Sequence, residues 1–355
     1  MVTLILLAIL LLPVALVGGG LALFMKRSRR AILRWAAMGY LLLVAVLVLA
    51  AGPYLIAYSL VHAGSRPMDL RLKSTPADFG IPYEDVVFNS QDSVRLNGWF
   101  VPPRGVSAII ICTHGLFRNR VEVLARIMPL AQQGYGALLY DSRSHGTSAK
   151  AKVSLGYFER YDVLGAIQYV RRRYQDALQQ PQIVLLGVSM GAVAILQAAE
   201  ESKDYSAVIL DSPFSTLRET AVRHSWLFFK LPRYPFPSLV MFWFERLSGF
   251  NPDRVDSNNA IRHMEPVPTL IIASEGDVRM GTGVAKDLFE ACRAPIKKLE
   301  IFGKDVPHGA AARLHPEEYS KLLKGFLDEA LGPEIREDVV PQAAIAPNAS
   351  TSSQK

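Results

Sequence analysis

Two long stretches without charged side chains near the N-terminus constrain this 355-residue chain more than any other feature. Residues 1–25 and 35–65 contain no Asp, Glu, Lys or Arg. Each run exceeds the roughly 20 apolar residues that span a bilayer core. Because a backbone in lipid must satisfy its own hydrogen bonds, both runs are predicted to be helices. We therefore expect residues 1–64 to form a membrane anchor with two transmembrane helices, at about 2–25 and 35–61.

The basic residues around these runs predict how the anchor is oriented. A cleaved signal peptide is the alternative for the first run, but such peptides carry basic residues before the apolar stretch, and here they follow it. Short loops rich in Lys and Arg stay in the cytoplasm. The loop between the two runs contains Lys26, Arg27, Arg29, Arg30 and Arg34, whereas only Arg66, Arg71 and Lys73 follow the second run closely. We expect an integral, multi-pass membrane protein whose termini and main domain are extracytoplasmic.

The same five basic residues account for most of the net charge of +7. Without them, 34 Lys and Arg face 32 Asp and Glu, so the rest of the chain is nearly neutral. A nucleic-acid site requires basic residues clustered on a folded face, and no nucleic-acid partner is therefore expected. The two cysteines, Cys112 and Cys292, are too few for a disulfide framework or a Cys-rich zinc site.

The remainder of the chain has the pattern of one large α/β domain. Residues 65–82 form a polar connector punctuated by Pro and Gly. Beyond it, short apolar runs alternate with helical patterns, which predicts a mostly parallel sheet with helices on both faces over residues 83–332. The expected strands are 94–101, 108–113, 136–140, 183–186, 207–210, 269–273 and 299–302, and the clearest helices are 120–133, 159–173, 191–202 and 316–330.

Residues 215–265 interrupt this alternation with a segment rich in aromatic residues and proline. One interpretation is a small helical subdomain with its own core. The other is a lid or an apolar wall for a hydrophobic substrate. Residues 333–355, composed largely of Ala, Pro, Asn, Ser and Gln, are predicted to be a disordered tail.

The sharpest motif is Gly187-Val188-Ser189-Met190-Gly191. A serine on a tight strand-to-helix turn is held in a strained conformation that exposes its hydroxyl, and the flanking glycines leave room for the crowded backbone. The pattern alone would occur by chance in about one in ten chains of this length. An apolar run before it and a helical stretch after it make it far more specific. Ser189 is therefore the candidate nucleophile.

A nucleophilic serine requires a histidine base, and the base requires a carboxylate that fixes its tautomer. In this topology the order along the chain is serine, acid, histidine, with each residue beyond the end of a strand. Asp277 and His308 satisfy that order. Glu275 and Asp211 are rival acids. His315 is a rival base, but Pro316 follows it, so helix capping or surface exposure explains it better.

Two backbone N–H groups are expected to form an oxyanion hole. One belongs to Met190, the residue after the nucleophile, and the other to Leu116, in the loop that follows an early strand. Gly115 lets that loop turn sharply, and His114 is expected to support it. The histidines outside the predicted triad show no metal-ligand spacing, so neither a metal nor a cofactor is expected.

Taken together, these residues resemble the α/β-hydrolase superfamily, and in particular its serine-aminopeptidase and monoglyceride-lipase-like branch. The resemblance covers about residues 83–331. It includes a loop similar to the family pattern Asp-x-Arg-Gly-His-Gly-x-Ser, in which Ser144 replaces the usual glycine. The matching residues are His114, Gly115, Asp141, Arg143, His145, Gly187, Ser189, Gly191, Asp277 and His308.

The resemblance implies a serine hydrolase that works through an acyl-enzyme without a cofactor. A serine at this turn argues against relatives that use aspartate there. The membrane anchor and the aromatic segment favour a small-molecule or lipid-like acyl ester or thioester as substrate. Two alternatives stay open: a serine peptidase or amidase of the same fold, and a catalytically silent, membrane-tethered binding module, since a fold does not guarantee a function.

Overall fold

The computed structural model describes residues 29–332, which divide into two compact units. One unit contains the chain up to Val61 together with Arg218–Pro252, and the other contains His62–Leu217 and the chain from Asp253 onward. The first predicted membrane helix, at about 2–25, and the predicted tail, 333–355, lie outside the described residues.

The first unit is built around a long apolar helix. It consists of α2 (Arg29–Val46), a π-helical segment (Leu47–Ala51) and α3 (Gly52–Val61). Its portion Leu33–Val61, 29 residues long, is the one helix of the described chain that is long and apolar enough to cross a membrane. This range confirms a helix where the second span is predicted. Length and composition of this kind occur in membrane anchors and in signal sequences.

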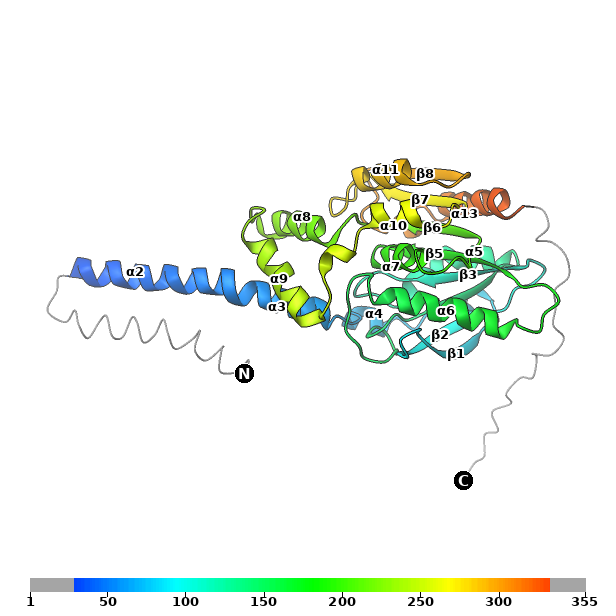
Figure 1. Cartoon of the computed structure of the whole chain (residues 1–355), viewed down its shortest axis with the longest axis horizontal. Coiled ribbons are helices and arrows are strands. Elements are labelled where there is room, and N and C mark those ends of the chain that lie inside the picture. Colours follow the sequence, from blue (N-terminus) through cyan, green and yellow to red (C-terminus); the bar gives the residue numbers. More distant parts are fainter. Residues whose placement is uncertain (1–28, 333–355) are drawn as a thin grey trace, which may run out of the picture. The chain divides into compact units, whose positions relative to one another are not determined.

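Two helices from the aromatic segment belong to the same unit, namely α8 (Leu217–Phe229) and α9 (Phe236–Ser248). Helix α9 packs against α3, as Figure 1 shows. The ring of Tyr54 meets the ring of Trp243 edge-on, with centroids 5.3 Å apart. Residues 218–252 are therefore grouped with the N-terminal apolar helix, whereas residues 253–265 belong to the second unit.

The second unit contains an eight-stranded sheet in the order β1-β2-β4-β3-β5-β6-β7-β8. Strand β2 is antiparallel to β1 and β4, and the other neighbours are parallel. All seven predicted strands are confirmed, with small shifts at their ends, and β1 is an additional one. The strands are β1 Glu84–Asn89, β2 Arg95–Val101, β3 Ala108–Thr113, β4 Gly136–Tyr140, β5 Gln182–Val188, β6 Ala207–Asp211, β7 Thr269–Ser274 and β8 Lys297–Phe302.

Helices cover both faces of this sheet, as predicted, because its central strands are apolar at most positions. In β3, Ile109 and Ile111 face one core, and Ile110 and Cys112 face the other. Helices α6, α7, α10 and α11 pack on the first face, and α5, α12 and α13 on the second. The helices of this unit are α4 Pro67–Arg71, α5 Leu124–Gln132, α6 Glu159–Arg173, α7 Met190–Ala199, α10 Ser257–His263, α11 Thr282–Ala291, α12 Ala311–Leu314 and α13 Pro316–Leu331, with short 3-10 turns at Pro76–Phe79, Arg120–Val123 and Pro252–Arg254.

Candidate active site

Ser189 stands between the end of β5 and the start of α7, with φ 54° and ψ −113°. Side-chain-bearing residues rarely adopt a positive φ, so this backbone is strained, as the motif predicts. The flanking glycines are required by space. A Cβ on Gly187 would lie 2.5 Å from the backbone N of Ala192, and one on Gly191 would lie 2.3 Å from the carbonyl O of Thr113. The turn therefore tolerates no side chain at either position.

The structure brings His308 between Ser189 and Asp277. His308 Nε2 lies 2.9 Å from Ser189 Oγ, and His308 Nδ1 lies 2.6 Å from Asp277 Oδ2. Asp277 Oδ1 also accepts hydrogen bonds from the backbone N–H groups of Arg279 and Met280. Burial acts to raise the pKa of Asp277, but its hydrogen bonds and the charge of His308 outweigh burial and hold that pKa below its ordinary value. The arrangement can move a proton from Ser189 to His308 while Asp277 stays ionised.

The alternative candidates for the acid and the base lie in other environments. Glu275 is exposed, two residues before Asp277. His315 precedes α13 and pairs with Asp305 at 3.0 Å, which agrees with a partly exposed residue at a helix start. Asp211 is 1% exposed and receives hydrogen bonds from Arg126 Nε and Tyr319 Oη, both at 3.0 Å.

The Arg126–Asp211 pair lies directly behind the base. Arg126 donates to the carbonyl O of Gly309, next to His308, at 2.7 Å. The N–H of Gly309 in turn donates to Ser212 Oγ at 3.2 Å, and Ser212 Oγ donates to Asp211 Oδ1 at 2.9 Å. Both polar groups of Gly309 are thus fixed by this network, which sequence reasoning missed. A basic residue in a predicted helix gives no signal that it reaches a residue 183 positions away.

The loop that follows β3 approaches the nucleophile closely. A Cβ on Gly115 would lie 3.6 Å from Ser189 Cβ. The Leu116 N–H donates no hydrogen bond within residues 29–332, and Met190 is the first residue of α7, whose N–H has no intrahelical acceptor. Both predicted donors are therefore free to bind an oxyanion. Their side chains share a small apolar cluster beside the nucleophile with Ala63, Phe117, Val153 and Leu155.

A carboxylate that sequence reasoning missed holds this loop. Glu122 Oε2 accepts the N–H of Gly115 at 2.7 Å, and Glu122 Oε1 pairs with Arg118 at 3.1 Å. The residues predicted as a connector also attach here. The backbone N–H of Arg66 donates to the carbonyl O of Phe117 at 2.9 Å, and Ser65 Oγ donates to the carbonyl O of Arg118 at 2.5 Å.

Two buried histidines support the loop as hydrogen-bond acceptors. His114 Nε2 accepts the N–H of Ser142 at 3.0 Å, and His145 Nε2 accepts the N–H of Phe117 at 3.3 Å. Each ring donates from Nδ1 to a backbone carbonyl O at 2.8 Å. Burial lowers the pKa of both rings, that of His145 to about 4, so they are neutral and able to accept at pH 7. The sequence predicts that His114 supports this loop, and its ring contacts the N–H of Ser142 and the carbonyl O of Gly115.

The loop that begins at Asp141 is fixed through carboxylates. Asp141 accepts the backbone N–H groups of Arg120 and Thr147, both at 2.9 Å. Arg143 pairs with Asp92 and Asp162 at 2.7 Å each. Ser144, where the family pattern has glycine, takes φ 66°, so this chain keeps the left-handed turn with a side chain in place.

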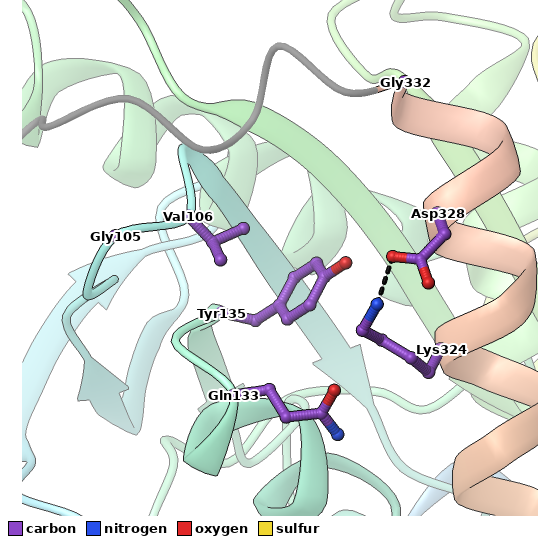
Figure 2. Close-up of a pocket in the computed structure, with 7 residues that line it drawn as sticks. All are labelled: Gly105, Val106, Gln133, Tyr135, Lys324, Asp328 and Gly332. Carbon is purple, nitrogen blue, oxygen red and sulfur yellow. Dashed lines mark hydrogen bonds and ion pairs between the residues drawn. The ribbon is translucent and has the colours of Figure 1, made fainter.

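A cavity of about 430 Å³ lies away from these residues. Its lining includes Gly105 and Val106, which precede β3, and Gln133 and Tyr135, which precede β4, together with the end of α13 (Figure 2). It therefore opens at the amino-terminal edge of the sheet, opposite the edge that bears Ser189. Within residues 29–332, no three His, Cys, Asp or Glu side chains gather as a metal site would require.

Comparisons with known proteins agree with this fold. The family model described as serine aminopeptidase, S33, matches residues 104–265. The uncharacterized protein YqkD of Bacillus subtilis is 26% identical over 66% of this chain and 75% of its own length. Monoglyceride lipase of Mus musculus is 28% identical over 45% of this chain and 54% of its own length. The solved structure of an esterase from Pyrococcus furiosus superposes with a TM-score of 0.62 at 26% identity, over 76% of this chain and 99% of the esterase.

The chain has the α/β-hydrolase fold, and it is a hydrolase of the esterase or lipase type. Over residues 104–265 it resembles the serine aminopeptidase family, and over 45% of its length it is similar to a monoglyceride lipase.

Proposed function

We propose that this protein is a membrane-anchored serine hydrolase that cleaves carboxylic esters or thioesters through an acyl-enzyme. One observation carries the proposal: His308 lies within hydrogen-bond distance of both Ser189 Oγ, at 2.9 Å, and Asp277 Oδ2, at 2.6 Å. These distances support the assignment of nucleophile, base and orienting acid that acyl transfer requires.

In this mechanism, His308 Nε2 takes the proton of Ser189 Oγ as the oxygen attacks the acyl carbonyl carbon. The Leu116 and Met190 N–H groups bind the negative charge that develops on the carbonyl oxygen. His308 then protonates the departing alcohol or thiol, which leaves an ester between Ser189 and the acyl group. A water that gives its proton to His308 attacks this ester, and the carboxylic acid and free Ser189 are released.

An apolar acyl group suits the surroundings of the nucleophile. Met190 is buried, and Leu116 and Phe117 pack beside it with Val153 and Leu155. The neighbouring esterase structure and the monoglyceride lipase relative also act, by their names, on esters. The family model is named for a peptidase, so an amidase or peptidase is the second candidate.

The first unit supports attachment to a membrane. Its apolar helix Leu33–Val61 is long enough to span a bilayer, and α9 packs against α3. Tryptophan and tyrosine prefer the boundary between lipid and water. The same unit exposes the aromatic residues Trp226, Phe228, Phe229, Tyr234 and Phe242. From the sequence alone, we further propose a second span at about 2–25 and an extracytoplasmic catalytic domain, because five basic residues lie between the two runs.

Fluorophosphonate labelling of the full chain in membranes tests the catalytic proposal. Wild type is expected to be labelled, and Ser189→Ala is expected to lose labelling at equal abundance. Failure of folded wild type to react would overturn the assignment. A panel of acyl esters beside aminoacyl amides then separates an esterase from a peptidase. A C-terminal reporter that is active only in the cytoplasm would refute the proposed orientation if it gave signal.

A further inference from the structure

One arginine next to the triad has no carboxylate partner. Arg279 lies two residues after Asp277, and its backbone N–H donates to Asp277 Oδ1 at 2.9 Å. Its side chain makes no hydrogen bond or ion pair with any residue that the structure describes, and its Nε is buried without a partner. The residue as a whole is partly exposed, but arginine stays charged in proteins, and a buried N–H of its guanidinium without an acceptor is costly. Such a group is typical of a site that receives its counter-charge from a ligand.

The two other arginines near this position are already compensated. Asp69 accepts from Arg66 Nε at 2.7 Å and from Arg118 at 2.9 Å. Arg118 also pairs with Glu122 at 3.1 Å. These two cations and two carboxylates therefore balance one another. Asp277 accepts from His308 and from the backbone N–H groups of Arg279 and Met280, so it accepts no hydrogen bond from the Arg279 side chain.

The topology puts Arg279 across the nucleophile from this balanced group. Arg118 and Glu122 follow β3, Ser189 follows β5, and Arg279 follows β7. In the sheet order β3-β5-β6-β7, the nucleophile lies between the two loops. Gly115 lies close to both Glu122 and the nucleophile. A Cβ placed on Gly115 would lie 3.3 Å from Glu122 Oε2 and 3.6 Å from Ser189 Cβ.

The electrostatics of Arg279 agree with that placement. Burial lowers its pKa first, Asp277 opposes that shift, and the charges of Arg118 and Arg66 lower the pKa further. Glu122 also acts on it, in the raising direction. Charges of residues that precede and follow β3 therefore act on this side chain as well as the neighbouring Asp277.

We propose that Arg279 binds an anionic group of the substrate, so that the enzyme prefers esters carrying a carboxylate or phosphate near the scissile bond. The inference rests on the proposed serine hydrolase function and specifies its substrate class. A guanidinium binds both anions through paired N–H groups, which explains why arginine suits this position. The anion replaces the partner that Arg279 lacks within the protein.

The test compares ester pairs that differ only in charge. Mono-4-nitrophenyl glutarate beside 4-nitrophenyl valerate places the charge on the acyl side. A 1-acylglycerol 3-phosphate beside the 1-monoacylglycerol of the same chain places it on the alcohol side. Each substrate is assayed with the full chain in detergent, for wild type, Arg279→Gln and Arg279→Lys. Arg293→Gln is the matched control, because Arg293 is exposed on the same unit and the change removes the same charge.

The measured quantity is the ratio of kcat/KM for the anionic ester to kcat/KM for its neutral partner. Arg279→Gln is expected to lower this ratio at least about tenfold in one pair, the size of a charged hydrogen bond, and that pair identifies the side that bears the anion. Arg279→Lys should retain part of the preference, and Arg293→Gln should leave the ratio unchanged. A ratio that Arg279→Gln leaves unchanged in both pairs overturns the inference. Absence of fluorophosphonate labelling in wild type would instead overturn the serine hydrolase on which it rests.

Discussion

Replacing Arg126 with methionine tests whether the buried pair behind the base fixes the catalytic geometry. Arg126 and Asp211 are 3% and 1% exposed, and their side chains meet at 3.0 Å. Burial acts to lower the pKa of Arg126, but Asp211, Tyr319 and Glu122 outweigh it and raise that pKa above its ordinary value. The guanidinium is therefore fully charged in the folded protein. Its interactions with the surrounding residues are largely electrostatic.

The magnitude follows from what Arg126→Met leaves behind. The Asp211 carboxylate would stay buried without its cation, a change that costs about 3–5 kcal/mol of unfolding free energy. In a domain of this size, that corresponds to a fall in Tm of roughly 6–20 °C. The carbonyl O of Gly309 would also lose the donor that now lies 2.7 Å away. Since a displacement of 1 Å at a reacting group can cost about a hundredfold in rate, we expect kcat to fall by roughly 10- to 100-fold.

The assay combines thermal unfolding of the full chain in detergent with 4-nitrophenyl butyrate hydrolysis well below the Tm of the variant. Lys298→Met is the control, because Lys298 and Glu329 form an exposed pair at 2.6 Å, which contributes about 0–1 kcal/mol. The double variant Arg126→Met with Asp211→Asn removes the stranded charge, so it should regain part of the Tm without regaining kcat. A Tm within 2 °C of wild type, roughly the effect of a surface pair, would refute the energetic reasoning. An unchanged kcat in folded Arg126→Met would refute the positioning role.

Three further predictions follow from the site. Asp277→Asn should lower kcat by about four orders of magnitude because it removes the acceptor that sets the His308 tautomer, and initial rates at pH 7 check this. The pKa of Asp277 is lower in the folded than in the unfolded protein, so its ionised carboxylate stabilises the fold above the unfolded pKa of about 3.9. This contribution to the free energy of unfolding is lost as pH falls through the folded pKa. Urea unfolding across that range should show the stability difference between wild type and Asp277→Asn disappearing. Gly191→Ala should destabilise the protein by about 1–3 kcal/mol and abolish labelling, since its Cβ would lie 2.3 Å from Thr113 O, and an unaltered Tm would contradict this.

The central sheet and the elbow were predictable because local sequence determines them. The runs Ala108–Thr113 and Ala207–Asp211 are apolar almost throughout and buried on both faces, a pattern typical of parallel strands. The strained turn at Ser189 needs small residues at fixed offsets, and Gly187 and Gly191 supply them. Strand β1 was missed because it lies at the sheet edge, where Val86 and Phe88 are buried and the residues between and beside them are not.

The residues that hold the candidate catalytic groups were not predictable, because their contacts join distant parts of the chain. Glu122 and Arg126 fall in the helix predicted at 120–133, and charged residues of a helix are usually assigned to its solvent side. Only the packed structure brings Glu122 to the N–H of Gly115 and Arg126 to Asp211. The environment of Arg279 was equally unpredictable. Its position two residues after Asp277 does not reveal that its Nε is buried without a hydrogen-bond partner.

The composition of the aromatic segment does not determine what this segment packs against. Its apolar residues recur at helical spacing, which fits a separate core, a substrate wall and a lipid-facing surface equally well. In the structure α9 packs against α3, so residues 218–252 complete a unit whose other part is the N-terminal apolar helix. Phe244 is buried in this unit, whereas Trp226, Phe228 and Phe229 are exposed. Aromatic residues that stay exposed after a helix has found its packing partner favour contact with lipid over a closed protein core.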